Sequence, residues 1–154
     1  MFEYSLAKAI QDGFVKEPAV ATRKDFDPSQ YSTDELDRIK LEDGIRIHED
    51  TKVALDIYAR DNKVKPVKPF VLVVALDTTH AGKLKHLIIS NAFFEGNYTD
   101  KVMEIHSNQS GEEKEENIEK LISLENPDNK IEIVIHVNML KEGWDVTNLY
   151  TIIP

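Results

Sequence analysis

The chain has 154 residues and no cysteine, so it makes one ordinary domain without disulfides or thiolate metal sites, a composition that suits a reducing cytosol. With 19 Lys and Arg against 28 Asp and Glu, its formal net charge is −9, which argues against a broadly basic nucleic-acid-binding face. The N-terminal residues lack the basic and apolar regions of an export signal, and no window approaches the roughly 18 apolar residues of a membrane span, so we expect a soluble protein.

The first 65 residues are predicted to form a connector and then a helical segment. In residues 1–32, a short helical pattern over residues 6–10 is followed by Gly13, a common helix stop, and Pro18 keeps the residue before it extended. Ser32 and Glu35 have the spacing of a capping box, which predicts that a helical segment over residues 33–65 begins there. Its apolar positions follow the helical period only loosely, and Gly44 is a candidate break point.

From residue 66 onward, short apolar runs alternate with helical patterns. This alternation predicts an α/β domain with a mainly parallel sheet covered by helices on both faces. Strands are expected at residues 70–76, 102–105, 131–137 and 149–153. Helices are expected at residues 79–94 and 111–124, with a short helical turn after residue 137. The glutamates of the second helix are interpreted as a solvated face, because a cation site needs carboxylates that converge.

The candidate site residues follow the strands, because ligands of open parallel sheets bind beyond the carboxyl ends of the strands. Three segments qualify: Asp77-Thr78-Thr79-His80, His106-Ser107-Asn108, and the stretch from Asn138 to Asp145. We expect all three along one rim of the sheet, with Asp145 at least partly exposed.

Missing motifs argue against several other kinds of site. Ser107, His80 and Asp77 suggest a hydrolase triad, but the chain has no G-x-S-x-G nucleophile elbow. The histidines lack the spacing of metal ligands. Neither a G-x-x-x-x-G-K-[ST] loop nor a G-x-G-x-x-G loop is present, so we expect no tight nucleotide binding by this chain alone.

One segment is distinctive enough to indicate a family. Residues Glu132 to Val146, with the sequence EIVIHVNMLKEGWDV, closely resemble motif V of the Res subunit of type III restriction endonucleases, which belongs to helicase superfamily 2. Residues 6–22 look like that family's exit from the first motor domain, and residues 68–80 look like its motif IV. The resemblance spans most of the chain but leaves residues 24–67 without a distinctive motif.

The resemblance implies half of a motor in which two RecA-like domains clamp ATP and move on DNA. Residues 66–154 would be a truncated second RecA-like domain. The phosphate loop, the Mg²⁺-binding acids and the arginine finger would lie outside this chain, so it is expected to be inactive alone. For the complete enzyme, the implied cofactors are ATP and Mg²⁺, and the implied partners are DNA and the modification methyltransferase subunit. The same likeness implies a cytoplasmic, bacterial protein.

The resemblance to motif V implies roles for individual residues of this segment. Gly143 and Asp145 match its glycine and aspartate, and this aspartate approaches the ATP ribose in related helicases; the alternative is that Asp145 only caps the turn after Gly143. Val137 and Asn138 stand where a Thr-Asp pair is usual, so a backbone or Asn138 contact must replace the missing hydroxyl. The candidate DNA contacts are Asp77, Thr78, His80, His106 and Asn138.

Two other functions stay open. One is an independent α/β binding module, receiver-like or Rossmann-like, in which Asp77 would be the acid at the rim. The chain does not offer the full set of acids and the late lysine of a receiver domain. The other is a protein-interaction domain that presents the acidic helix at residues 111–124 to a partner.

Overall fold

The computed structural model describes residues 5–13, 16–106, 111–137 and 146–154, which belong to two compact units, Met1–Gln30 and Tyr31–Pro154. The first unit contains helix α1 (Leu6–Gln11) and a 3-10 turn, η1 (Pro28–Gln30). Ser5 caps α1 by accepting a hydrogen bond from the backbone N–H of Lys8. Gly13 follows the helix with a φ of 78°, which confirms the predicted helix stop.

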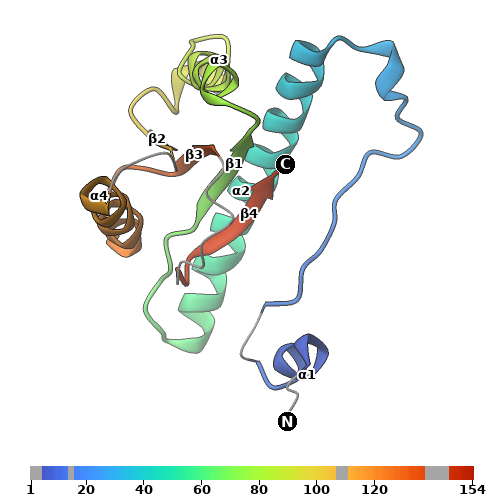
Figure 1. The fold of residues 1–154 in the computed structure, drawn as a ribbon. Helices are drawn as coiled ribbons and strands as arrows, with labels where there is room; N and C mark the ends of the chain where they lie inside the picture. Colours follow the sequence, from blue (N-terminus) through green and yellow to red (C-terminus); the bar gives the residue numbers. More distant parts are fainter. Residues whose placement is uncertain (1–4, 14–15, 107–110, 138–145) are drawn as a thin grey trace. The chain divides into compact units, whose positions relative to one another are not determined.

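The second unit is built on a four-stranded parallel sheet (Figure 1). Its strands are β1 (Phe70–Ala75), β2 (Val102–His106), β3 (Ile133–Val137) and β4 (Leu149–Ile153), and their order across the sheet is β2-β3-β1-β4. The predicted α/β class and the parallel sheet are therefore confirmed. The central strands β1 and β3 are buried along almost their whole length, which explains their nearly unbroken apolar sequences.

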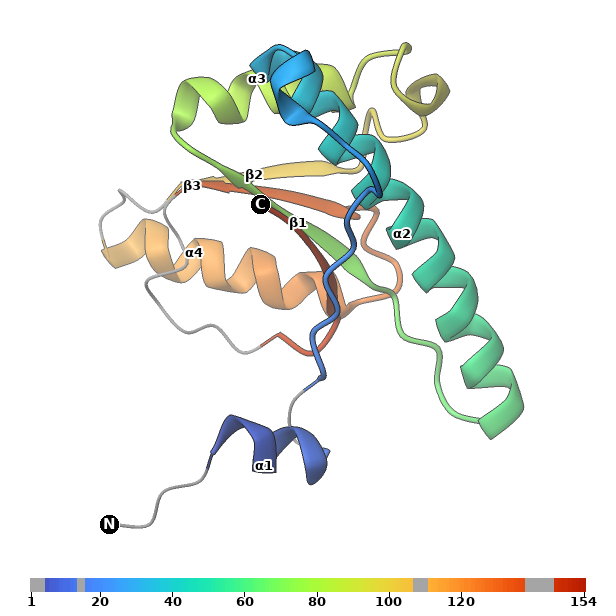
Figure 2. The same cartoon turned by 90° about the vertical axis from the view of Figure 1, so that its right-hand side faces the viewer.

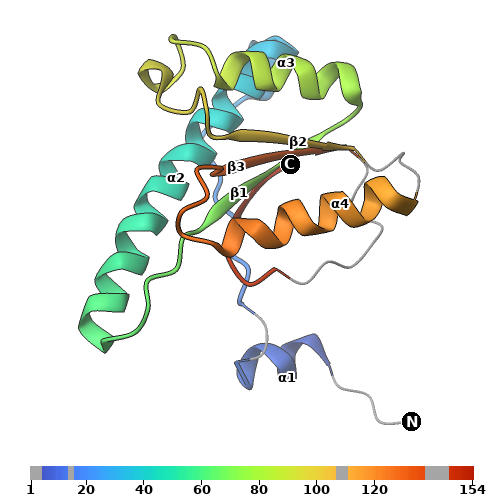
Figure 3. The same ribbon diagram turned by 90° about the vertical axis from the view of Figure 1, so that its left-hand side faces the viewer.

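Helices cover both faces of this sheet, as Figures 2 and 3 show. One face carries α2 (Thr33–Asn62) and α3 (Thr78–Ile88), and the other carries α4 (Gly111–Ile122). Alternate residues of β1 serve the two layers, since Val71 and Val73 pack on the α2 and α3 side while Phe70 and Leu72 pack on the other. The chain moves outward from β1 to β2 and back to β3, so two right-handed crossovers require helices on opposite faces.

Helix α2 is a single helix of 30 residues, so the candidate break at Gly44 is wrong. The predicted capping box is present: Ser32 Oγ accepts from the N–H of Glu35 at 3.3 Å, and Glu35 Oε2 accepts from the N–H of Ser32 at 2.8 Å. Gly44 serves close packing instead, because a Cβ there would lie 2.2 Å from Cδ1 of Ile153 on β4. Its missing side chain lets the helix pass close over the sheet.

Helix α3 is shorter than the sequence predicts. It ends at Ile88 rather than near Phe94, and positive φ angles follow at Phe94, Glu95 and Gly96. Left-handed residues cannot continue a right-handed helix. Phe93 is 1% exposed in the core beneath α2 and α3, and its ring lies 4.8 Å from that of Phe94 in an edge-on contact. Burial of these aromatic rings therefore outweighs the helical pattern of the sequence.

Helix α4 and its glutamates agree with the predicted solvated face. Glu115, Glu116 and Glu119 are exposed, whereas Asn117 and Leu121 are buried. The helix ends at Ile122 and passes into a 3-10 turn, η3 (Ser123–Glu125), rather than continuing to residue 124. Among the described helices, none combines the length and the apolar character of a membrane span.

Candidate functional site at the carboxyl edge of the sheet

The carboxyl ends of β1, β3 and β2 lie side by side at one edge of the sheet. Ala75 pairs with Val137, and Val137 pairs with His106, so the last residues of β2 and β3 form a row with the last residue of β1. Asp77 and Thr78 follow β1 at this edge, as predicted. Asn138, Gly143 and Asp145 lie outside the described residues, and the exposure of Asp145 stays a prediction.

The strands that follow β1 and β3 in the sequence lie in opposite directions across the sheet. The strand after β1 is β2, on the far side of β3, whereas the strand after β3 is β4, on the far side of β1. Because β1 and β3 are neighbours, the strand order reverses between them. Ligands of open α/β sheets bind at such reversal points. The residues directly after β1 and β3 are therefore the ones expected closest to a ligand.

Asp77 has a structural role at the start of α3. Its carboxylate accepts a hydrogen bond from the backbone N–H of His80 at 2.7 Å, which makes it the N-cap of the helix. A negative charge at this end is also favoured by the helix dipole. Thr78 and Thr79 follow, and both are exposed. Helix capping thus accounts for Asp77, while the exposed Thr78 remains a candidate DNA contact.

His80 joins the β1–α3 turn to α2. Its Nδ1 accepts a hydrogen bond from the N–H of Leu76 at 3.1 Å, so the ring proton must be on Nε2 when the histidine is neutral. Nε2 lies 2.9 Å from Oδ2 of Asp37, to which it donates. Both ring nitrogens are therefore engaged, and a DNA contact by the His80 ring would require one of these bonds to be exchanged.

His106 ends β2 among charged neighbours. Its Nε2 lies 3.6 Å from Oε1 of Glu104. The other carboxylate oxygen of Glu104, Oε2, lies 3.2 Å from Lys85 Nζ. The backbone carbonyl of His106 accepts a hydrogen bond from the Asn117 side chain at 3.4 Å. Its Nδ1 is buried and has no hydrogen-bond partner within the described part of the chain. His106 is thus half-buried at the edge, with one ring nitrogen left without a described partner.

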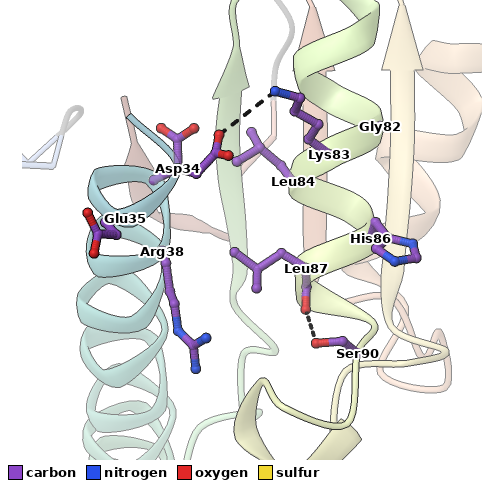
Figure 4. Close-up of a pocket in the computed structure, with 10 residues that line it drawn as sticks. Asp34, Glu35, Arg38, Gly82, Lys83, Leu84, His86, Leu87 and Ser90 are labelled. Carbon is purple, nitrogen blue, oxygen red and sulfur yellow. Dashed lines mark hydrogen bonds and ion pairs between the residues drawn. The ribbon is translucent and has the colours of Figure 1, made fainter. Parts of the chain in front are cut away.

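Two adjacent hollows follow the seam between α2 and α3. The smaller, of about 230 Å³, lies at the end of β1 and is lined by Thr33, Asp34, Asp37, Leu76, Asp77, Thr79, His80 and Lys83. The larger, of about 790 Å³, continues along the helices, where Leu84 and Leu87 lie between α3 and α2 (Figure 4). The nearby cations are already paired, Lys83 with Asp34 at 3.8 Å and Arg38 with Glu42 at 2.8 Å. Carboxylates thus already neutralise the lysine and arginine side chains of these hollows, which does not favour a triphosphate there.

A polar cluster at the opposite, amino edge of the sheet surrounds Glu132. This residue precedes β3, is 8% exposed, and accepts hydrogen bonds from His48 Nε2 at 3.2 Å and Lys52 Nζ at 2.9 Å. Lys101 Nζ lies 3.1 Å from its second oxygen. Burial by itself would raise the pKa of Glu132, but hydrogen bonds from His48, Lys52 and Lys101 hold that pKa well below its ordinary value of 4.5.

Two further side chains extend this cluster. Lys52 Nζ also lies 3.1 Å from Oε1 of Glu49, and the Tyr98 hydroxyl donates a hydrogen bond to the same carboxylate oxygen. Burial, and then the hydrogen bond and negative charge of Glu49, raise the pKa of the Tyr98 hydroxyl. Tyr98 therefore stays a protonated donor across the pH range in which proteins fold.

Within the described residues, one group has the geometry to hold a metal ion. The ligand atoms of His48, Glu49 and Glu132 all lie within 4.8 Å of one another. The ammonium group of Lys52, however, already bridges the two carboxylates. His48 Nδ1 has no described hydrogen-bond partner, whereas a metal-bound histidine normally donates from its second nitrogen. The arrangement therefore fits an ion-pair cluster better than a metal site.

Sequence reasoning missed this cluster because its members are far apart in the chain. Glu132 contacts residues 80 and 84 positions away, on α2. The one local signal is that the charged Glu132 stands directly before β3, a strand that is buried along its whole length. That signal reveals a polar neighbourhood but not its members.

No family profile matches this chain, and no characterised protein or solved structure matches it. The likeness to Res subunits therefore rests on the residues of the motifs themselves.

Proposed function

We propose that this chain is part of the ATP-driven DNA motor of a type III restriction endonuclease. It would supply the edge of a second RecA-like domain that faces nucleotide and DNA. The observation that carries the proposal is the segment from Glu132 to Val146, which closely resembles motif V and includes the central strand β3. A four-stranded parallel sheet with flanking helices is compatible with a RecA-like domain.

This chain would contribute only part of the nucleotide site. Phosphoryl transfer in such motors needs a phosphate loop, carboxylates that bind Mg²⁺ and an arginine, and these would come from outside this chain. Gly143 and Asp145 would approach the nucleotide after β3. The candidate DNA contacts at the same edge are Asp77, Thr78, His80, His106 and Asn138. DNA and the modification methyltransferase subunit would be the partners of the complete enzyme.

The order of the strands counts against one rival function. In flavodoxin-like sheets, which include receiver domains, β1 lies between β2 and β3, and in the Rossmann sheet β1 lies between β2 and β4. In this chain β1 lies between β3 and β4. An independent receiver-like or Rossmann-like module is therefore the weaker proposal.

The direct test uses the protein encoded by the complete reading frame. Asp145→Ala should lower the kcat/KM of DNA-stimulated ATP hydrolysis by roughly 10- to 100-fold, the loss expected for one hydrogen bond to a charged group. Asp128→Ala is the matched control, because Asp128 is an exposed aspartate in the turn before β3. Unchanged hydrolysis in Asp145→Ala would refute the assigned role of motif V.

A second test uses this chain alone. It should release no phosphate from ATP above the buffer control, because it contains no phosphate loop. Phosphate release that disappears in Asp145→Ala would contradict the proposal that the chain is an incomplete motor.

Protein interaction through α4 is the second candidate function. Ile118 and Ile122 are 37% and 54% exposed on this helix and lie among exposed glutamates. An apolar strip within an acidic helix is a plausible binding surface for another protein. Full ATP hydrolysis by Asp145→Ala, together with loss of a partner in Ile122→Ser, would favour this function over the motor.

A further inference from the structure

Helix α2 extends well beyond the sheet that it covers (Figures 1 and 2). Its 30 residues measure about 45 Å at about 1.5 Å per residue, whereas the six residues of β1 span about 20 Å. The buried positions of α2 are Leu41, Gly44, Ile45, His48 and Ala59. After His48 the helix thus has a single buried position, and its C-terminal half projects past the amino edge of the sheet.

This projecting half carries large apolar side chains on one side. Val53, Ile57 and Tyr58 are 60%, 47% and 60% exposed. Val53 and Ile57 are four residues apart, as are Ala54 and Tyr58, so the two pairs form neighbouring rows on the helix surface. Ile47, 40% exposed, extends the same side by two turns toward the N-terminus. We call these five residues the outer face of α2.

Single exposed apolar residues are ordinary on protein surfaces, but a continuous stripe is not. The outer face repeats at three- and four-residue spacing, the pattern by which one helix packs against another. The core side of α2 uses a different set of residues, including Leu41, Ile45 and Ala59. The helix therefore has a second apolar side that the described residues of Tyr31–Pro154 leave uncovered.

The charges beside the outer face that lack an ion-pair partner in the described part of the chain are acidic, because the nearby Arg46 and Arg60 pair with Asp43 and Asp56. Asp50 lies three and four residues before Val53 and Ala54, and Asp61 lies three and four residues after Tyr58 and Ile57, so both aspartates lie on the same side of the helix. Both are exposed, and neither forms an ion pair or a hydrogen bond within the described part of the chain. The apolar stripe is thus bordered by carboxylates that lack a positive partner.

We propose that the outer face of α2 docks an amphipathic helix of another protein, and that this helix carries Lys or Arg beside its apolar stripe. The span from Ile47 to Asp61 is about 20 Å of helix, which is enough to hold about four turns of a partner helix. Helices recognised in this way are read through apolar side chains at three- and four-residue spacing. The two aspartates then select basic residues at the borders of the interface.

The same charges argue against two other occupants. Antiparallel pairing of two copies about the midpoint of Val53 and Tyr58 would bring Asp50 of each copy opposite Asp61, and this like-charge contact opposes association. An anionic membrane surface would be repelled for the same reason. Apart from Ile47, the outer face lies on the part of α2 that projects past the amino edge of the sheet, away from the carboxyl edge, so this docking does not depend on the proposed motor function.

The probe is a fluorescein-labelled peptide of 18 residues, with leucines at three- and four-residue spacing and lysines beside them. It should bind this chain saturably in fluorescence anisotropy at physiological salt. A peptide with glutamates in place of the lysines should bind at least about tenfold more weakly, because the aspartates then repel it. Amide shifts in heteronuclear NMR spectra should centre on residues 47–61.

Substitutions on α2 make the test specific. Ile57→Ser should weaken binding of the lysine peptide by about tenfold or more. The matched control is Ile152→Ser, which changes an exposed isoleucine on β4, outside both α2 and α4, and should leave binding unchanged. Should Ile57→Ser lower the melting temperature, Val53→Ser replaces it as a second exposed position on the same side. The double variant Asp50→Lys with Asp61→Lys should reverse the preference, so that the glutamate peptide binds more tightly.

Three results would overturn the proposal. The first is equal binding of the lysine and glutamate peptides, which would remove the basis for a basic partner. The second is binding that Ile57→Ser and Val53→Ser leave unchanged. The third is self-association in sedimentation experiments that Ile57→Ser abolishes, since this would make a second copy the occupant.

Discussion

Replacing Glu132 with glutamine should destabilise the second unit by about 2–4 kcal/mol near neutral pH. Glutamine keeps the size of the side chain but removes its charge and leaves one acceptor oxygen for His48, Lys52 and Lys101. A hydrogen bond to a charged group contributes about 1.5–3 kcal/mol, and removing one partner of a buried ion pair costs about 3–5 kcal/mol. Lys52 and Lys101 are 35% and 33% exposed and keep part of their hydration, so we expect less than the full cost.

The destabilisation caused by Glu132→Gln should also depend on pH. Glu132 has a lower pKa in the folded chain than its ordinary value of 4.5. Its carboxylate therefore contributes stability that is present above pH 4.5 and is lost as the pH falls toward the folded pKa. The difference in unfolding free energy between the wild type and Glu132→Gln should be largest at neutral pH and should shrink below pH 4.5.

Urea unfolding followed by circular dichroism at several pH values measures this difference. Glu119→Gln is the control, because Glu119 is exposed on α4, and it should change stability by less than about 0.5 kcal/mol. A loss below about 1 kcal/mol for Glu132→Gln at neutral pH would refute the reasoning. So would a difference that stays constant as the pH falls, because the charge of Glu132 would then not be its source.

Three further predictions address packing, capping and charge. Gly44→Ala should destabilise the fold by about 1 kcal/mol in thermal melts, because overpacking against Ile153 outweighs the higher helix propensity of alanine. Adding Ile153→Val should recover part of this loss. A Gly44→Ala chain that is more stable than the wild type would show that the Ile153 side chain turns away from the new methyl group. Asp77→Ala should lower the free energy of unfolding by about 1 kcal/mol, because α3 loses its N-cap. Asp77→Asn should be close to the wild type in stability, since asparagine also caps helices. An unchanged melting temperature in Asp77→Ala would argue against the cap. Duplex DNA should show no saturable binding to this chain in fluorescence anisotropy at physiological salt, because a net charge of −9 leaves little counterion release; submicromolar affinity would contradict this expectation.

Local features of the fold could be predicted from the sequence, because each depends on residues within about one helical turn of each other. The capping box of Ser32 and Glu35 and the helix stop at Gly13 are of this kind. The parallel sheet could be predicted too, since buried parallel strands need apolar runs separated by crossover helices. From that sheet alone, Asp77 and His106 could be assigned to one edge.

Contacts between distant segments could be decided only by the tertiary structure. The pattern after Thr78 predicts a helix to Phe94, but the core beneath α2 and α3 buries Phe93 and ends the helix at Ile88. Gly44 suggests a break until Ile153, on a strand more than 100 residues later, is found against it. His80 is bound by Asp37, 43 residues away, and Glu132 by Lys52, 80 residues away. Periodicity and capping residues indicate where a helix or strand begins and which of its sides is buried, but not which other element packs against that side. The partners of these side chains depend on that packing, so only the tertiary structure reveals them.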